Sequence, residues 1–260
     1  MTVSFGPMDL DGIHVEAHGP HGGTPIVLVH GAPDRSTSFR PLLAELTDRR
    51  VVTYDRRGYG RSLGAEPPTA MVDHAHDLLG VIEQVGAPAV VVAHSFGSNP
   101  AMLAATLRPE AFAAFGVWEP PLVWIDEWPQ FTKDYNGRVA AADDPAAPIE
   151  HFYRRVLGDA VWDGQSDGGK TRRRAEGVAF QVDMASELTA PFAFEDVVVP
   201  TLVGYGTETG AFHDGGSIWL AETLPDARLH VVEGTAHFAP RTHPAEYAGF
   251  VRATAALAGA

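Results

Sequence analysis

The sequence contains no cysteine, so neither disulfides nor thiolate metal ligands can contribute to the fold. It also has no apolar run near the roughly 18 residues that a membrane-spanning helix needs. The opening segment, MTVSFGPMDLDG, lacks the basic start and apolar stretch of a signal peptide. These absences predict a cytoplasmic protein whose stability comes from packing.

Basic residues are also few, because 19 lysines and arginines stand against 33 aspartates and glutamates, giving a net charge of −14. Such a balance repels phosphate backbones and anionic membranes, so we expect neither nucleic acid nor a membrane as partner. The one basic run, KTRRR at 170–174, is typical of a solvated helix face, and we assign it no function. The sequence leaves open whether the chain forms a homo-oligomer.

Several short apolar runs rich in β-branched residues have the length and continuity of strands buried on both faces. They are residues 25–30, 50–55, 89–94, 113–118, 200–205 and 227–234. Segments with helical spacing lie between several of them, which predicts an α/β fold with a parallel sheet covered on both sides. Near the start, residues 2–5 and 13–19, separated by DLDG, predict a hairpin of two antiparallel edge strands.

This alternation stops after Glu119, and no convincing strand follows before Val199. We expect residues 1–120 and 191–260 to form the core domain and residues 121–190 to form a helical lid over one end of the sheet. Many apolar residues of the lid are aromatic, which indicates an apolar substrate pocket. Trp124 and Trp128 are therefore candidate substrate-binding residues.

The segment VVVAHSFGSNPAM, residues 90–102, has the pattern of a strand, a tight turn and a helix start, with Ser95 at the apex. A nucleophile raised on such a strained turn needs small neighbours two residues to either side, and Ala93 and Gly97 are small. The helix beginning at Phe96 directs free N–H groups at the site, which favours an oxyanion beside Ser95. The pattern favours a nucleophilic serine over one that caps a helix.

Two further segments carry groups that a nucleophilic serine needs. The strand ending in HGAP, residues 30–33, leaves the backbone N–H of Ala32 free to pair with that of Phe96 as two oxyanion donors. His237 lies in a short loop after the last strand, and a general base for Ser95 must be neutral near pH 7 and carried on a positionable loop. We therefore predict that His237 is the base.

Three other histidines, His30, His230 and His243, are expected to be structural. The run DHAHD at 73–77 resembles a metal site, but side chains at positions i and i+2 of a helix diverge, which favours a solvated helix face. The predicted chemistry requires no metal and no organic cofactor.

The order HGAP, DRRGYGRS, AHSFGS and GTAHF, with matching strands and helices between, resembles the α/β-hydrolase superfamily over essentially the whole chain. The resemblance implies an eight-stranded, mostly parallel sheet, with Ser95 as nucleophile, His237 as base, and Ala32 and Phe96 as oxyanion donors. It also implies an acid that orients the histidine. In that family the acid is most often the aspartate of a G-x-x-D turn after the penultimate strand, whereas this turn is Gly206-Thr207-Glu208-Thr209.

Three alternatives follow for the acid. The first is Glu208, which lies one position away, although its side chain would leave the turn in another direction. The second is that the triad is broken and has no acid. The third is Glu119, which ends the preceding strand at the sheet edge where α/β active sites assemble. A glutamate ending an apolar strand is costly to bury unless it is paired, which favours Glu119. This layout is similar to that of the fungal zearalenone lactonases. We then expect the turn around Thr209 to have no catalytic role.

The residues and the resemblance together predict a serine hydrolase that cleaves an ester or lactone of a rather apolar small molecule through an acyl-enzyme. Cofactor-independent perhydrolysis and hydrolysis of a C–C bond on the same triad remain alternatives. So does a non-catalytic ligand-binding protein on the same scaffold.

Overall fold

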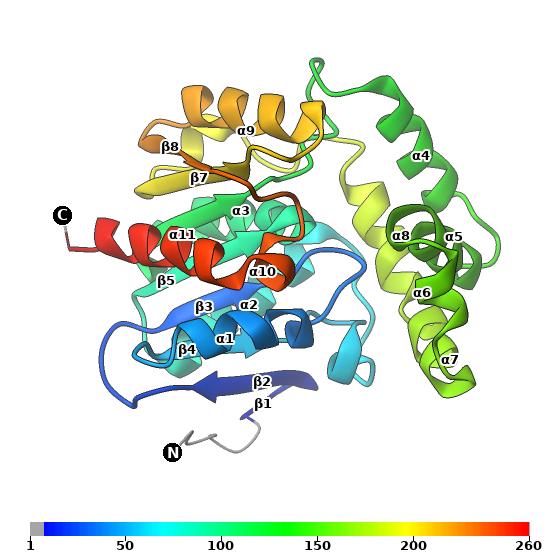
Figure 1. The fold of residues 1–260 in the computed structure, drawn as a ribbon, viewed down its shortest axis with the longest axis horizontal. Coiled ribbons are helices and arrows are strands. Elements are labelled where there is room, and N and C mark those ends of the chain that lie inside the picture. Colours follow the sequence, from blue (N-terminus) through cyan, green and yellow to red (C-terminus); the bar gives the residue numbers. More distant parts are fainter. Residues whose placement is uncertain (1–7, 260) are drawn as a thin grey trace.

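An eight-stranded sheet forms the centre of the computed structural model, which describes residues 8–259 (Figure 1). Its strand order is β1-β2-β4-β3-β5-β6-β7-β8. The strands are β1 Met8–Leu10, β2 Ile13–His18, β3 Ile26–Val29, β4 Val51–Tyr54, β5 Ala89–His94, β6 Phe112–Trp118, β7 Thr201–Gly206 and β8 Ala227–Val232. Strands β3 to β8 pair in parallel, while β2 pairs antiparallel with both β1 and β4. The prediction of a mostly parallel sheet is confirmed.

The central strands are apolar on both faces, as their sequences predict, and every residue of β3, β4 and β5 is buried. Strand β8 differs, because Leu229 and Val231 are 41% and 45% exposed. The prediction that residues 227–234 are buried on both faces is wrong, since β8 is the last strand of the sheet and has a neighbouring strand on one side only.

The antiparallel edge begins with a tight hairpin between β1 and β2. Asp11 and Gly12 form its turn with φ angles of 49° and 83°, and positive φ at both central residues is characteristic of a type I′ turn. Asp9 and Leu10, which the sequence analysis placed in the connection, therefore belong to β1. The first strand predicted at residues 2–5 lies outside the described residues.

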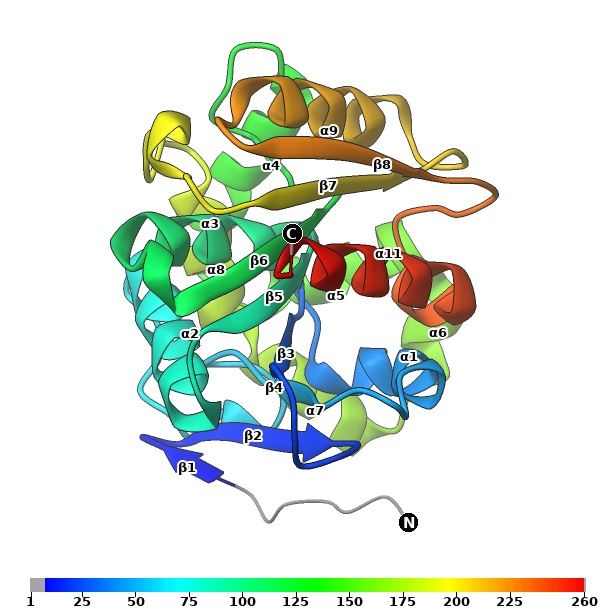
Figure 2. The ribbon, with the colours of Figure 1, turned by 90° about the vertical axis from the view of Figure 1, so that its left-hand side faces the viewer.

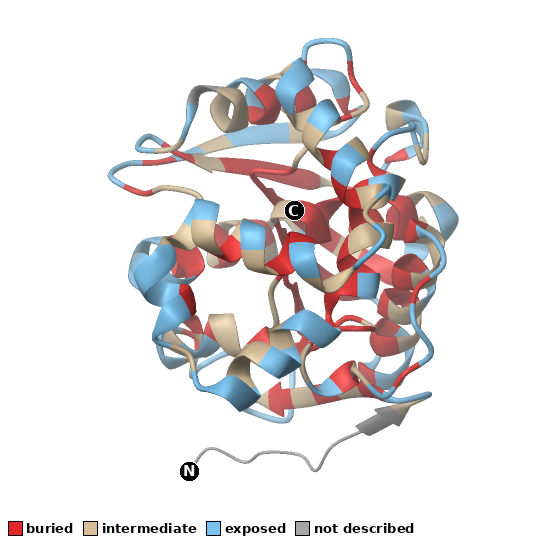
Figure 3. Cartoon of the chain, turned by 90° about the vertical axis from the view of Figure 1, so that its right-hand side faces the viewer, coloured by how far each residue is buried: buried red, intermediate tan, exposed pale blue. Residues whose placement is uncertain are grey.

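Helices cover both faces of the sheet (Figure 2). On one face lie α1 Arg40–Glu45, α10 Ala239–Thr242 and α11 Pro244–Leu257, and on the other lie α2 Met71–Val85, α3 Ser98–Leu107 and α9 Ala211–Thr223. Short 3-10 helices occur at η1 Ser36–Phe39, η2 Gly60–Ser62, η3 Ser95–Gly97, η4 Pro109–Ala111 and η5 Phe194–Asp196. Buried residues concentrate where the sheet meets these helices, so each face has its own apolar layer (Figure 3).

Five helices lie between β6 and β7, where the sequence predicted an all-helical insertion (Figure 1). They are α4 Gln130–Ala140, α5 Ala146–Leu157, α6 Asp159–Asp163, α7 Asp167–Ala175 and α8 Gly177–Ser186. All five fall within residues 121–190, and the division into a core and a lid stays a prediction. None of the described helices is long and apolar enough to cross a membrane.

A buried polar cluster joins α8 of the insertion to the core. Asp183 accepts hydrogen bonds from Arg56 at 2.8 Å, Tyr59 at 2.7 Å and His74 at 2.9 Å. Burial alone would raise the pKa of Asp183, but the Arg56 guanidinium holds it at about 2. His74 belongs to the DHAHD run, whose prediction as a solvated face is wrong at this residue because α8 packs against α2.

Candidate active site

Ser95 lies at the sharp turn where β5 passes into η3 and then α3. Its φ of 54° is in the left-handed region, which is rare for a residue with a side chain and places strain on this turn. A Cβ at Gly97 would come within 2.4 Å of the backbone oxygen of His30, so this position tolerates only glycine without a shift. Close packing of the backbone around this turn is therefore the reason that a glycine is needed two residues after Ser95.

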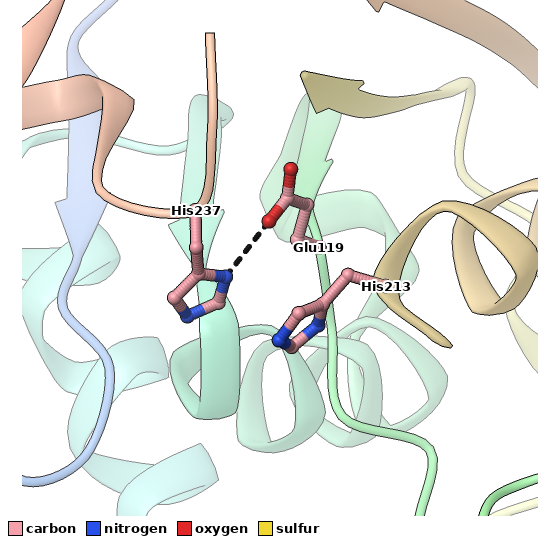
Figure 4. Close-up of side chains that lie close together, drawn as sticks. All are labelled: Glu119, His213 and His237. Atoms are coloured by element: carbon pink, nitrogen blue, oxygen red, sulfur yellow. Dashed lines mark hydrogen bonds and ion pairs between the residues drawn. The ribbon is translucent and has the colours of Figure 1, made fainter. Parts of the chain in front are cut away.

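A continuous chain of hydrogen bonds connects Ser95, His237 and Glu119. Nε2 of His237 lies 3.1 Å from the Ser95 hydroxyl oxygen. Its Nδ1 lies 2.8 Å from Oε2 of Glu119, the contact drawn in Figure 4. The three residues come from the ends of β5 and β6 and from the loop after β8, which the parallel sheet brings to one edge. This geometry can remove a proton from Ser95 and stabilise the resulting imidazolium.

Glu119 is fully buried and is held by the turn that follows β7. Its Oε1 accepts the backbone N–H of Gly206 at 2.9 Å, and its Oε2 accepts the Thr209 hydroxyl at 2.9 Å. The turn around Thr209 therefore helps to hold the carboxylate, because Thr209 bonds the same oxygen of Glu119 as His237; that the turn has no catalytic role stays a prediction. Glu119 has a φ of 45°, so its backbone is strained like that of Ser95.

Glu208, the alternative acid, is exposed to solvent. Its backbone N–H donates to the oxygen of Thr235 at 2.8 Å, which fixes the turn with this residue on the outside. The structure thus brings Glu119 to His237 and leaves Glu208 away from it.

Two histidines that the sequence analysis did not single out also contact His237. Nε2 of His94 donates to the backbone oxygen of His237 at 2.6 Å, and His213 stacks on the His237 ring with centroids 4.4 Å apart and planes 18° from parallel. Trp128 packs edge-on against His213, with centroids 6.2 Å apart. These contacts depend on tertiary packing, and no local motif marks them.

Glu119, His213 and His237 bring potential metal-ligand atoms within 4.8 Å of one another (Figure 4). A metal ion needs ligand lone pairs that converge, whereas the lone pairs of two stacked imidazoles lie in separate, nearly parallel planes. Both ring nitrogens of His237 also have partners, in Glu119 and Ser95. We assign this group no metal.

A cavity of about 620 Å³ opens beside Ser95 and His237 and lies between the core and the helical insertion. Trp128 and several other aromatic residues line it, which gives the wall a largely apolar character. Trp124 is not part of this wall, because it stacks on Phe194 with centroids 6.0 Å apart. We therefore assign Trp124 no role in binding and correct the expectation that it binds substrate.

The two predicted oxyanion donors, Ala32 and Phe96, both line the cavity beside Ser95. Within the described part of the chain, the backbone N–H of Ala32 donates no hydrogen bond to another protein group. Phe96 is the second residue of η3, and the first N–H groups of a helix have no partner within it. Both positions can therefore offer a donor at the cavity, which is the arrangement an oxyanion requires.

Burial shifts the pKa values of His237 and Glu119 toward the uncharged forms. Burial lowers the pKa of His237 well below its usual 6.5, and the nearby His94 lowers it further. Burial raises the pKa of Glu119, while the hydrogen bond from Gly206 partly opposes that change. A neutral imidazole at Ser95 is the form that can accept a proton.

These shifts predict where activity falls in acid. Because His237 must be neutral to accept the Ser95 proton, activity is retained below pH 6.5 and is lost as the pH falls through the lowered pKa. A profile of kcat/KM against pH on an uncharged ester measures this limb. A limb at or above the ordinary histidine value would contradict the prediction.

The sequence of this chain matches the Alpha/beta hydrolase family over residues 26–250, so the chain belongs to that family. The "Putative carbamate hydrolase RutD" of Caulobacter vibrioides is 29% identical over 255 residues, spanning 90% of this chain and 92% of that protein. The lipase LipV of Mycobacterium tuberculosis is 32% identical over 109 residues, which is 42% of this chain and 41% of LipV.

Solved structures share the fold over the whole chain. A thermophilic esterase from Thermogutta terrifontis superposes with a TM-score of 0.75 at 21% identity, covering 100% of both chains. An alpha/beta hydrolase from Sphaerobacter thermophilus superposes with a TM-score of 0.69 at 27% identity, covering 96% of this chain and 99% of that one. Membership of this family supports hydrolase activity.

Proposed function

We propose that the protein hydrolyses a carboxylic ester or lactone of a small, rather apolar molecule through an acyl-enzyme. The observation that carries the proposal is the continuous chain of hydrogen bonds from Ser95 through His237 to Glu119. Ser95, at one end of this chain, lies at an apolar cavity. Its spacing matches the requirement that nucleophile and base, and base and orienting acid, lie within hydrogen-bond reach.

In this mechanism Ser95 attacks the substrate carbonyl while Nε2 of His237 takes the hydroxyl proton. Glu119 accepts the Nδ1 proton in a hydrogen bond, which fixes the tautomer and stabilises the imidazolium. The backbone N–H groups of Ala32 and Phe96 stabilise the oxyanion of the tetrahedral intermediate. His237 returns the proton to the leaving alcohol, and water then releases the acid by the same steps.

The cavity supports an apolar substrate because aromatic side chains dominate the wall next to Ser95. Of the two candidate tryptophans, Trp128 remains a candidate substrate-binding residue, since it lines the cavity and packs against His213. The likeness to a protein named for carbamate hydrolysis makes carbamates a reasonable second substrate class to test, because their cleavage uses the same attack on a carbonyl.

A fluorophosphonate probe tests the nucleophile. We expect it to label wild-type protein at Ser95, to leave Ser95→Ala unlabelled, and to abolish release of p-nitrophenol from p-nitrophenyl esters. A panel of linear esters, lactones, carbamates and peroxide then separates ester cleavage from its alternatives on the same machinery. Folded protein that neither reacts with the probe nor cleaves any panel member would favour a ligand-binding protein instead.

A further inference from the structure

The cavity wall differs in charge from the rest of the protein. The whole chain carries 33 acidic and 19 basic residues, whereas the described residues of the wall include three arginines, Arg155, Arg173 and Arg241, against Asp34 and Glu187. Burial raises the pKa of Glu187 well above its ordinary value, which favours its uncharged form. A strongly acidic protein therefore presents a cationic wall at its active site.

Two of these arginines are available to a ligand. Arg155 on α5 and Arg241 on α10 are exposed, and neither forms an ion pair within the part of the chain that the structure describes. Arg154, the neighbour of Arg155, contrasts with it, because Arg154 pairs with Glu150, Asp159 and Asp163. The insertion thus neutralises one arginine of this adjacent pair and leaves the other at the cavity.

Arg173, from the basic run KTRRR, is already occupied. It lies 3.5 Å from Glu176, which Arg35 also contacts, and packs over the ring of Tyr153 at 5.1 Å, so Arg173 already has partners within the protein. Asp34, the acidic residue of the wall, accepts a hydrogen bond from the Ser38 hydroxyl. Because the Ser38 hydroxyl is neutral, Asp34 keeps its negative charge, and the charged residues of the described wall without an ion pair are Asp34 and the two cations Arg155 and Arg241.

The two arginines stand among exposed apolar side chains, which together form the rim of the cavity. The rim comprises these arginines with Phe131, Val156, Val161 and Phe238. Arg155 belongs to the insertion, while Arg241 follows His237 by four residues in the core, so both parts of the chain contribute a cation. A rim of this composition suits an amphiphilic ligand, because the apolar part can pass the aromatic wall while a charged end stays at the arginines.

We propose that the substrate is an ester that carries a carboxylate at the end remaining at the rim, where Arg155 and Arg241 bind it. This inference rests on the proposed ester hydrolysis and specifies its substrate class. A guanidinium presents a planar set of donors that matches a carboxylate, so arginine is suited to this recognition. Because the rim is exposed, the contribution is screened by salt and is modest for each arginine.

The test compares anionic esters with neutral partners of similar size. One pair places the carboxylate on the acyl chain, in p-nitrophenyl hydrogen suberate against p-nitrophenyl octanoate. A second pair places it on the alcohol, in 4-carboxyphenyl octanoate against its methyl ester. For each pair the ratio of kcat/KM is compared between wild type and Arg155→Gln/Arg241→Gln, so that differences in intrinsic reactivity cancel.

We expect the anionic-to-neutral ratio of one pair to fall about tenfold in this double variant, with most of the change in KM. The same ratio should fall in wild type as sodium chloride rises from about 20 mM to about 500 mM. The control Arg138→Gln/Arg228→Gln removes two exposed arginines that do not line the cavity, and it should leave both ratios unchanged.

Failure of this inference differs from failure of the proposed function. If the neutral esters are cleaved but both ratios are the same in wild type and in Arg155→Gln/Arg241→Gln, the carboxylate site is overturned and the esterase stands. An equal loss in the Arg138→Gln/Arg228→Gln control would also overturn it, because net charge and not the rim would then attract the substrate. If no ester is cleaved by folded protein, the proposed function itself fails.

Discussion

Replacing Glu119 by glutamine should lower kcat/KM for an ester substrate by about 10⁴-fold, while Glu208→Gln changes it by less than about twofold. The physical reason is the tautomer of His237. Glu119 accepts a hydrogen bond from the Nδ1–H group, which keeps the ring proton on Nδ1 and leaves Nε2 free to accept the proton of Ser95. A glutamine whose amide N–H faces Nδ1 would donate there, and the ring proton would then occupy Nε2, where it blocks proton transfer.

The measurement is steady-state hydrolysis of a p-nitrophenyl ester by both variants and by wild type. Thermal unfolding serves as a control, because glutamine has the shape of glutamate and can still accept the Gly206 N–H, so the fold should persist. Glu208 is exposed, so its amide variant controls for loss of one acidic charge. If Glu208→Gln had the larger effect, Glu208 would be assigned as the acid of the triad. Small effects of both variants would indicate a serine–histidine dyad.

Much of the fold follows from local sequence. The runs that became β3, β4 and β5 are apolar on both faces, and the intervening helical spacing leaves a parallel sheet as the simple solution. Strand β8 shows the limit of this reasoning, because β-branched residues form a strand at the edge as readily as in the centre. The amino-acid pattern of a strand does not indicate whether that strand lies at the edge of the sheet.

Some residues of the site could likewise be predicted from the sequence, whereas others could not. Ser95 and His237 lie in motifs whose spacing alone indicates their position, and Glu119 could be favoured because it ends an apolar strand. The contacts of Thr209 with Glu119 and of His74 with Asp183 span 90 and 109 residues, so no local pattern contains them. The stacking of His213 on His237 likewise depends on how α9 is placed on the sheet.

Placing an aspartate at residue 209, in the turn after β7, should restore part of the activity of a variant that lacks the Glu119 side chain. We expect Glu119→Ala/Thr209→Asp to exceed Glu119→Ala by about 10² in kcat/KM. Thr209 and His237 bond the same oxygen of Glu119, at 2.9 Å and 2.8 Å, so residue 209 already faces the space next to Nδ1. Removing the Glu119 side chain empties that space, and aspartate extends further than threonine toward the imidazole.

The matched control is Glu119→Ala/Thr209→Asn, which has the same size but carries no charge and should recover little. If the aspartate variant recovers no more than the asparagine variant, residue 209 cannot present a carboxylate to His237 despite the short contacts. Recovery by the aspartate alone would show that two strand ends can orient one histidine. The turn after β7 and the end of β6 meet at this carboxylate through Gly206 and Thr209, so an acid from either strand would act at nearly the same point.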